Sequence, residues 1–354
     1  MFCVNLDDFE ANAKAVASAR AWNYYSSAAD DLLTYHRNAA DWKRISFRPR
    51  VLRDVKRVSM RQNILGTEFA LPFFIAPAAL GRLGHPDGEL CLARGAASWQ
   101  VPYAVSSGAS LALKDIMEAS ASSGGSHGLW YQLYVRKDRQ ANLNLISEAR
   151  QLGYAALLVT VDTPVVGKRE EDDRQKAQAA YEAGERTAPV IGATGQSSEN
   201  DDFVFRGPYS SSFTWDDLKW IREAWGDQGP ICLKGITSAE DAKLASELGY
   251  DNIYLSNHGG RQLDASPSSL MTLMEIRRFY PELLMKCQIL VDGGARRGQD
   301  ALKALCLGAR AVGIGRPFMF AMTGYGVDGV SKALQSKCDI LVSSIHKTDL
   351  TSTE

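Results

Sequence analysis

The sequence predicts an α/β protein built as a (β/α)8 TIM barrel, and three observations carry this prediction. Eight short apolar segments, each as long as a buried strand, recur along the chain. Amphipathic stretches of helix length separate most of them, and apolar strands that alternate with helices are typical of a parallel sheet covered by helices. Eight such units fit a closed barrel. The competing fold is a doubly wound open sheet.

An N-terminal helical segment, expected over residues 1–50, precedes the barrel. Helical spacing of apolar residues runs from Leu6 to about Ala40, with an interruption at NYYSSAADD. After FRPRVLRDV the spacing changes to short apolar segments. We therefore expect the barrel to occupy residues 70–335 of a single domain that spans 1–354.

The barrel strands are predicted from the apolar segments themselves. The helical stretches between them often begin at Ser, Asp or Gly and end at Gly, as the chemistry of helix caps favours. The predicted strands cover residues 72–77, 101–107, 129–135, 155–162, 230–235, 252–257, 288–294 and 310–316.

A long polar insert follows the fourth predicted strand, over residues 167–212. Its first part, GKREEDDRQKAQAAYEAGE, has the composition of a charged helix, and its second part is rich in Ser, Gly and Asn and is expected to be a mobile loop. Long connections at one end of a barrel often act as lids over a site. We expect a lid-like insert, and a surface excursion without function is the alternative.

The composition is that of a soluble globular protein. The net charge is −1, whereas nucleic-acid-binding and membrane-surface proteins carry a basic excess. No apolar stretch approaches the ~20 residues that span a bilayer. The cysteines form no CxxC pair, so reduced thiols are expected and no metal site. His85 and His127 lie in loop-like sequence and are interpreted as surface or turn histidines.

The two ends of the sequence bear on location. The start, MFCVNLDDFE, lacks the basic and apolar regions of a secretory signal. The end, LTSTE, is not a peroxisomal tripeptide of the SKL type. A cytoplasmic location is therefore expected, and a peroxisomal one is left open.

Polar residues gather where the predicted strands end. The carboxyl ends of barrel strands share one mouth, where barrel enzymes carry their active sites. One such residue alone is weak evidence because it could cap a turn, but convergence from seven or more strands is hard to explain by capping. The residues are Ser106, Gln132, Tyr134, Thr160, Asp162, Lys234, Ser256, His258, Asp292 and Arg316.

The last two units, VDGGARRGQD and GIGRPF, indicate a ligand that bears a phosphate. Their glycines allow backbone N–H groups to approach an anion, and Arg296 and Arg316 add positive charge. The loops after the seventh and eighth strands are the usual phosphate site of this fold. Walker spacing is absent, as is a GxGxxG after a first strand, so ATP and a Rossmann-bound dinucleotide are poor candidates.

His258 is the natural general base, because an unperturbed imidazole titrates near neutrality, and Asp162 is placed to orient it. Arg261 and Arg169 are suited to hold a carboxylate between them. Lys234 has two interpretations. It is either a Schiff-base lysine, as in aldolases, or a cation beside a cofactor that becomes anionic on reduction. The residues alone leave both open.

Five motifs together resemble those of the FMN-dependent α-hydroxy acid oxidases and dehydrogenases, which include glycolate oxidase, lactate oxidase and mandelate dehydrogenase. The motifs are TVDTP with the following GKRE, LKGI, SNHGGRQLD, DGGARRG and GIGRP. The likeness runs from residue 24 to about 335. It implies one FMN hydroxy acid dehydrogenase domain, FMN at the barrel mouth, oxidation of an L-2-hydroxy acid to the 2-oxo acid, and a homotetramer or octamer.

Carried over residue by residue, the resemblance makes His258 the base that removes a proton from the substrate while two electrons pass to flavin N5. Asp162 pairs with the protonated imidazole. Lys234 stabilises the reduced anionic flavin, which favours the cofactor interpretation over the Schiff base. Whether the reaction passes through a carbanion or a hydride is left open.

The resemblance also implies the binding residues. Arg169 and Arg261 bind the substrate carboxylate, and Tyr24 and Tyr134 lie at the carboxylate and the hydroxyl. The implied cofactor contacts, besides Lys234, are Pro77, Ala78, Ala79, Ser106, Gln132, Thr160, Ser256, Asp292, Gly294, Arg296, Gly315 and Arg316.

One departure from the family concerns the substrate. Where glycolate oxidase carries a tryptophan after SS, this chain has Gly108, and Leu80 and Val166 would line the same side. Loss of a large aromatic side chain should admit a bulkier α-substituent, so a substrate larger than glycolate is expected. O2 or a separate electron acceptor would reoxidise the flavin. The rival hypotheses are a flavin-free lyase that uses Lys234 and a barrel kept as a binding module.

Overall fold

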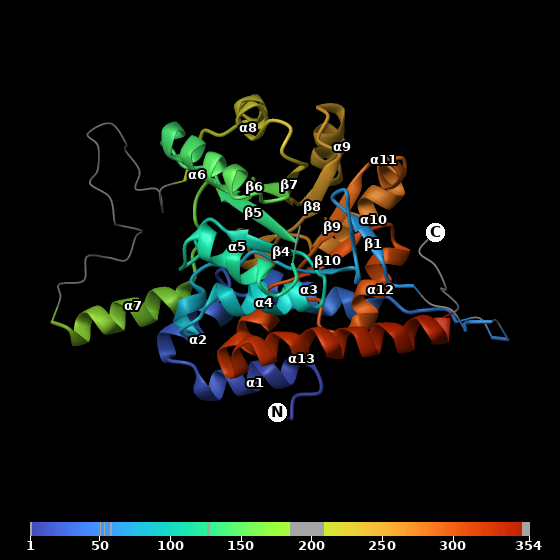
Figure 1. Cartoon of the computed structure of the whole chain (residues 1–354), viewed down its shortest axis with the longest axis horizontal. Coiled ribbons are helices and arrows are strands. Elements are labelled where there is room, and N and C mark those ends of the chain that lie inside the picture. Colours follow the sequence, from blue (N-terminus) through green and yellow to red (C-terminus); the bar gives the residue numbers. More distant parts are fainter. Residues whose placement is uncertain are drawn as a thin grey trace.

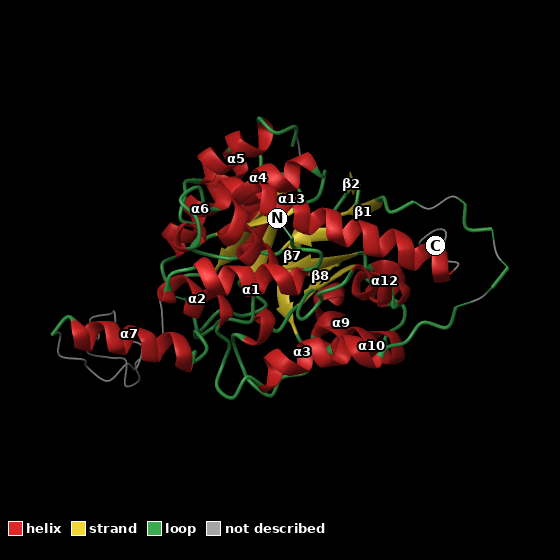
Figure 2. Ribbon diagram, turned by 90° about the horizontal axis from the view of Figure 1, so that it is seen from below, coloured by secondary structure: helices red, strands yellow, loops and turns green. Residues whose placement is uncertain are grey.

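Eight parallel strands close into a barrel, in the order β10-β3-β4-β5-β6-β7-β8-β9. The computed structural model describes residues 2–49, 51–52, 54–56, 59–125, 128–184 and 209–348. Helices surround the strands on all sides (Figure 1, Figure 2). The predicted (β/α)8 barrel is confirmed, and the doubly wound open sheet is wrong.

Each predicted strand overlaps one barrel strand. Because helices cover the outside of the barrel and side chains fill its inside, the strands are buried on both faces and need no polar alternation. Phe74, Trp130 and Tyr254 are the largest side chains in the interior cluster. The strands are β3 (Phe73–Ile75), β4 (Tyr103–Ser106), β5 (Leu129–Tyr134), β6 (Ala156–Thr160), β7 (Ile231–Ile236), β8 (Asn252–Leu255), β9 (Gln288–Val291) and β10 (Ala311–Ile314).

The connecting helices begin where the sequence offers side-chain caps. Asp138, Ser238 and Ser268 each accept hydrogen bonds from the first turn of the helix that follows. The connecting elements are η1 (Gly81–Leu83), α4 (Glu89–Ser98), α5 (Leu113–Ala121), α6 (Arg139–Gln151), α8 (Leu218–Trp225), α9 (Ala239–Glu247), η2 (His258–Gly260), α10 (Ser269–Phe279), α11 (Leu283–Lys286) and α12 (Gly298–Cys306).

The N-terminal segment folds into three helices, α1 (Leu6–Val16), α2 (Ala19–Ser26) and α3 (Leu33–Arg44). Helix α1 packs along the long C-terminal helix α13 (Arg316–Thr348) (Figure 2). Helix α3 packs against η2, the short turn after β8. The N-terminal helices therefore supply side chains to the end of the barrel where the strands finish.

A β-hairpin that the sequence did not predict covers the opposite end of the barrel. Its strands are β1 (Gln62–Ile64) and β2 (Thr67–Phe69). Ile64, Leu65 and Phe69 join the interior cluster of the barrel. The backbone N–H of Leu65 donates to Oε1 of Gln288, at the start of β9, over 2.8 Å. The hairpin therefore closes the end where the strands begin.

The insert after β6 begins with the expected charged helix, α7 (Glu170–Glu182). This helix extends away from the barrel (Figure 1). The part expected to be a loop lies mostly over residues 185–208, outside the described residues, as does His127. The chain is described again from Tyr209, which forms an isolated antiparallel bridge with Arg136, just after β5. The role of the insert as a lid stays a prediction.

Within the described part of the chain, the helices are too short or too polar to cross a bilayer.

Candidate active site

A cavity of about 960 Å³ opens where the barrel strands end, and the N-terminal helices contribute to its wall. Most of the site residues that the sequence predicted meet here, although they come from distant parts of the chain. Those that line the cavity are Tyr24, Pro77, Ala78, Ala79, Tyr134, Arg169, Lys234, His258, Arg261, Asp292, Gly294, Arg296, Gly315 and Arg316.

Three predicted residues lie beneath the cavity and do not line it. Ser106 Oγ donates to Oε1 of Gln132 over 2.9 Å, and Gln132 Nε2 donates to Oγ1 of Thr160 over 2.8 Å. All three side chains are buried, and they come from the neighbouring strands β4, β5 and β6. This chain of hydrogen bonds forms a fixed polar layer under the mouth of the barrel.

The turn that carries His258 runs through left-handed backbone. The φ angles are 59° at His258, 64° at Gly259 and 75° at Gly260. A Cβ on Gly260 would lie 2.7 Å from the backbone nitrogen of Tyr35, so this position requires glycine. At His258 the left-handed conformation costs about 1 kcal/mol, and such strain often marks a functional position. Ser256 Oγ supports the turn by accepting the backbone N–H of His258 over 3.1 Å.

His258 is held between an acid and a phenol. Its Nδ1 lies 2.9 Å from Oδ1 of Asp162, and its Nε2 lies 2.8 Å from the hydroxyl of Tyr134. A carboxylate only accepts hydrogen bonds, so Nδ1 carries the proton and Nε2 accepts from Tyr134. Nε2 is therefore the basic atom, and its ring faces the cavity.

Burial, more than the surrounding charges, keeps the imidazole of His258 neutral. Burial is the main cause that lowers the pKa of His258 to about 4; Asp162 raises it, and Lys234 and Arg169 lower it further. For Asp162, burial acts to raise the pKa, but His258 and Lys234 outweigh it and hold the pKa well below its usual range. At neutral pH the pair is a neutral base beside an ionised acid.

Two arginines lie beside the base, and no described carboxylate pairs with either of them. Arg261 Nη1 donates to the carbonyl oxygens of Tyr24 and Ser27, over 2.8 Å each. Burial and the nearby charge of Arg169 lower the pKa of Arg261. The Nε atom of Arg169 is buried and makes no hydrogen bond within the described part of the chain. Two partly buried cations with an unused donor fit a ligand that carries a carboxylate.

At the carboxyl ends of β9 and β10, Arg316 and Arg296 are already engaged, and Arg316 shares the Ser27 carbonyl with Arg261. Arg316 donates to the carbonyl oxygens of Tyr25, Gly259 and Ser27 over 3.0, 2.9 and 2.9 Å. Arg296 Nη1 lies 2.7 Å from Oε2 of Glu10 on helix α1. The charges expected at a phosphate site are present, and the N-terminal helices fix their positions.

Gly294, which follows β9, lies against helix α3. A Cβ there would lie 2.3 Å from the carbonyl carbon of Asn38, and its φ is +77°, so glycine is required. The glycine in DGG thus allows α3 to pack close to the loop after β9.

Asp292 leaves one acceptor unused. Its Oδ2 accepts from the hydroxyl of Tyr254 over 2.7 Å, whereas its Oδ1 is buried and has no hydrogen-bond partner among the described residues. Burial raises the pKa of Asp292. An unpaired buried acceptor at a cavity wall is costly without a ligand that donates to it.

Comparison with known proteins decides the family. The profile of FMN-dependent dehydrogenases matches residues 13–344. The chain belongs to the FMN-dependent dehydrogenase family. The chain is 39% identical to the L-lactate dehydrogenases (cytochrome) of Wickerhamomyces anomalus and Saccharomyces cerevisiae, over 94% and 99% of its length. It spans only 56% and 59% of the lengths of these two relatives.

Other relatives match over most of their length. The chain is 38% identical to 2-hydroxyacid oxidase 2 of Bos taurus, over 97% of its own length and 92% of the relative. A double mutant of flavocytochrome b2 with pyruvate bound superposes with a TM-score of 0.88 at 37% identity, covering 99% of this chain and 84% of that one. A mandelate oxidase mutant with (S)-mandelic acid superposes with a TM-score of 0.84 at 32% identity, covering 99% of this chain and 96% of that one.

The family takes FMN as its cofactor, and the residues of this chain fit it. The unused Oδ1 of Asp292 suits a hydroxyl donor such as those of a ribityl chain. Lys234 places a buried ammonium group at the cavity wall, and its side chain is 4% exposed. A Cβ on Gly315 would have only Ala76 within 4 Å, so the bare backbone there leaves room for a ligand. The resemblance seen in the sequence is thus confirmed.

Sequence reasoning missed several residues of the wall. Tyr25, Tyr35, Asn38 and Trp42, all on α2 and α3, line the cavity. They follow no strand, so the strand-end signal that located the other residues does not apply to them. The aromatic pair in NYY was the only local sign.

Gly108 lies at the edge of this site and does not line the cavity. A Cβ there would lie 3.0 Å from Cβ of Ala79, which does line it, and the carbonyl of Gly108 accepts from the backbone N–H of Leu80 over 3.1 Å. The side chain of Leu80 is half-exposed. The contact of Gly108 with substrate stays a prediction.

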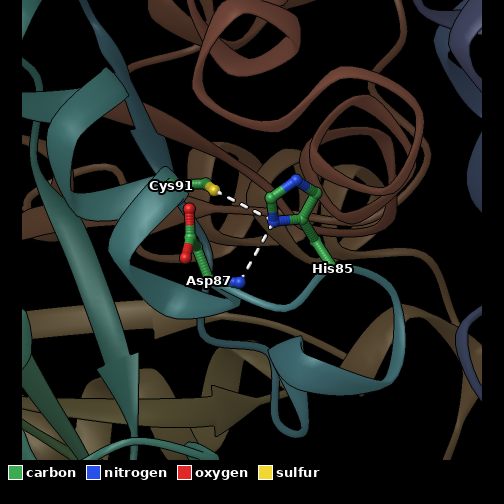
Figure 3. Close-up of side chains that lie close together, drawn as sticks. All are labelled: His85, Asp87 and Cys91. Carbon is green, nitrogen blue, oxygen red and sulfur yellow. Dashed lines mark hydrogen bonds between the residues drawn. The ribbon is translucent and has the colours of Figure 1, made fainter.

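A cluster of His85, Asp87 and Cys91 lies outside the cavity (Figure 3). His85 Nδ1 accepts the backbone N–H of Asp87 over 3.2 Å and lies 3.5 Å from Sγ of Cys91. Burial raises the pKa of the Cys91 thiol to about 11, so it is not a thiolate at neutral pH. His85 is placed as a turn residue before α4, as the sequence indicated.

Proposed function

We propose that the chain oxidises an L-2-hydroxy acid to the 2-oxo acid with FMN. The observation that carries this proposal is the neutral base His258 beside two partly buried arginines, Arg169 and Arg261, in one cavity. A 2-hydroxy acid bears a carboxylate next to the carbon that is oxidised, so it needs an anion site next to a base. The printed names of the relatives, lactate dehydrogenase and 2-hydroxyacid oxidase, support the same reaction.

Each residue of the site has a separate role in the proposed reaction. Arg261 and Arg169 bind the carboxylate and orient the substrate. His258 Nε2 takes up a proton from it, and Asp162 stabilises the imidazolium that results. The Tyr134 hydroxyl, on the same nitrogen, moves to the substrate oxygen when the proton arrives. FMN, when bound, accepts the two electrons.

FMN itself would be held along the same cavity. Asp292 would accept from the ribityl chain, with the phosphate near Gly294, Arg296, Gly315 and Arg316. Lys234 would supply a positive charge next to the ring. The further ring contacts proposed are Pro77, Ala78, Ala79, Ser106, Gln132, Thr160 and Ser256.

The environment of Lys234 argues against the lyase alternative. Its Nζ lies 3.8 Å from Oδ2 of Asp162 and 3.4 Å from Oγ of Ser256. The carboxylate attracts an ammonium ion, whereas a Schiff base forms from a neutral amine. Lys234 therefore suits a cation beside a cofactor.

Activity should persist on acidification to well below neutral pH. The folded pKa of His258, about 4, lies below its ordinary value of 6.5. The neutral form of His258 is the active one. Its titration should therefore leave kcat/KM constant above about pH 6 and lower kcat/KM about tenfold per pH unit once the pH is below the folded pKa. Kinetics from acidic to neutral pH measure this limb. A limb centred near the ordinary value would contradict the burial of the base.

The proposal is tested by an anaerobic screen. The FMN-loaded protein is mixed with glycolate, lactate, mandelate, and longer aliphatic and aryl 2-hydroxy acids, and the visible flavin absorbance is followed. We expect bleaching, and we expect a substrate bulkier than glycolate to bleach fastest. Admission of O2 to the best pair then separates an oxidase from a dehydrogenase that needs another acceptor. A flavin that no 2-hydroxy acid bleaches would refute the proposal. Assembly as a homotetramer or octamer stays a prediction.

A further inference from the structure

Tyr209 packs against Tyr134, and Tyr134 in turn contacts the catalytic base His258. Its ring stacks on the ring of Tyr134, with centroids 4.7 Å apart and an interplanar angle of 26°. The hydroxyl of Tyr134 in turn lies 2.8 Å from Nε2 of His258. Tyr209 does not line the cavity, and its ring reaches the base through Tyr134. Tyr24 and Arg169 also lie near enough to affect the pKa of the Tyr209 hydroxyl.

The position of Tyr209 is fixed by the barrel. Tyr209 forms a bridge with Arg136, and the N–H of Ser210 donates to the carbonyl of Val135 over 2.9 Å. The buried side chain of Asn142 holds Arg136 at both backbone groups, over 2.9 and 2.8 Å. The end of β5 and the start of α6 therefore set where the Tyr209 ring lies.

We propose that Tyr209 is a positioning residue, which covers one face of the Tyr134 ring and so keeps the Tyr134 hydroxyl on Nε2 of His258. The inference rests on the proposed oxidation of a 2-hydroxy acid. An aromatic ring without a partner on its face can turn about its side-chain bonds, and a stacked ring loses that freedom. The insert after β6 thus returns to the barrel at a residue that orders the active site.

Because Tyr209 holds Tyr134 in place, it also affects the pKa of His258. The groups that face His258 are Asp162 after β6, Lys234 on β7, Arg169 at the start of the insert, and Tyr134 on β5. Tyr134 donates to the lone pair of Nε2, which stabilises the neutral base. If the hydroxyl leaves Nε2, the neutral form loses a hydrogen bond and the pKa of His258 rises.

The test compares three variants of the FMN-loaded protein. Tyr209→Ala removes the stack, Tyr209→Phe keeps the ring, and Tyr134→Phe removes the hydroxyl that Tyr209 is inferred to hold. For Tyr209→Ala we expect kcat/KM to fall about tenfold and the acidic limb of its pH profile to move up by about half a pH unit. Tyr134→Phe should show a shift in the same direction, and Tyr209→Phe should keep both properties of the wild type.

A readout without turnover accompanies the kinetics. The 2-oxo acid product of the best substrate is titrated into the oxidised holoenzyme, and binding is followed through the visible flavin spectrum. Tyr209→Ala should weaken binding less than it lowers kcat/KM, because the two arginines that bind the carboxylate are untouched. A change in KM alone with an unmoved acidic limb would overturn the inference, since it would mean that Tyr209 only fills space. If none of the 2-hydroxy acids bleaches the flavin of the wild type, the proposed function fails, and this experiment says nothing against the role of Tyr209.

Discussion

Replacement of His258 by alanine is expected to lower kcat/KM by about 10⁴-fold, the upper range for loss of a general base. Of the described residues that line the cavity near the arginines, His258 alone combines a neutral nitrogen with an ionised partner, Asp162. The variant should still bind FMN, because every inferred cofactor contact except Ser256 lies on or after another strand, and Ser256 itself is unchanged. Steady-state kinetics with the best substrate, normalised to flavin content, measure the loss.

His85→Ala provides the matched control for this experiment. His85 lies in the turn before α4 and does not line the cavity, and its Nδ1 meets the backbone N–H of Asp87 and the thiol of Cys91. This variant should keep wild-type kinetics. If His258→Ala kept more than about a tenth of the wild-type kcat/KM, another group would have to be the base.

Replacement of Asp162 by asparagine is the second large effect, and we expect kcat to fall by about 10²- to 10⁴-fold. Asparagine keeps the shape of the side chain but removes the charge that stabilises the imidazolium. Its amide can also donate to Nδ1, which would place the imidazole proton on Nε2 and block the basic atom. The same change leaves the ammonium group of Lys234 without the carboxylate that lies 3.8 Å away.

Thr163→Val perturbs the Asp162 carboxylate less than Asp162→Asn does. Thr163 Oγ1 donates to Oδ1 of Asp162 over 2.8 Å, so valine removes one hydrogen bond and keeps the charge. We expect a loss of about tenfold or less. Product binding to the oxidised enzyme should survive in both variants, because Arg169 and Arg261 remain. A kcat for Asp162→Asn equal to that of the wild type would show that the charge of Asp162 plays no part in the reaction.

The barrel could be predicted from sequence because its signals are local. Each strand is a short apolar segment that ends near a polar residue such as Lys234 or Asp292. The same pattern therefore predicted both the strands and the residues at the mouth of the barrel. The motif SNHGGRQLD also encodes its own turn, because Gly259 and Gly260 permit left-handed backbone. Even so, the sequence did not show that His258 itself adopts this conformation.

The parts that sequence did not predict depend on contacts between distant segments. The β1–β2 hairpin has strands of three residues each, too short for a periodic pattern, and its register depends on packing against the barrel. Tyr35 and Asn38 reach the cavity because α3 packs against η2. Tyr209 joins the site through a single bridge to Arg136. Neither composition nor spacing near these residues encodes such contacts.

The central claim is that His258 and FMN together oxidise a 2-hydroxy acid, and an anaerobic single turnover tests it most directly. The FMN-loaded wild type is mixed with its best substrate, the flavin absorbance and the 2-oxo acid are quantified, and the protein is then treated with borohydride and weighed by mass spectrometry. We predict 2-oxo acid in an amount equal to the FMN bleached, and no added mass on the protein. Product formed with the flavin still oxidised, together with a borohydride-trapped adduct on Lys234, would contradict the account.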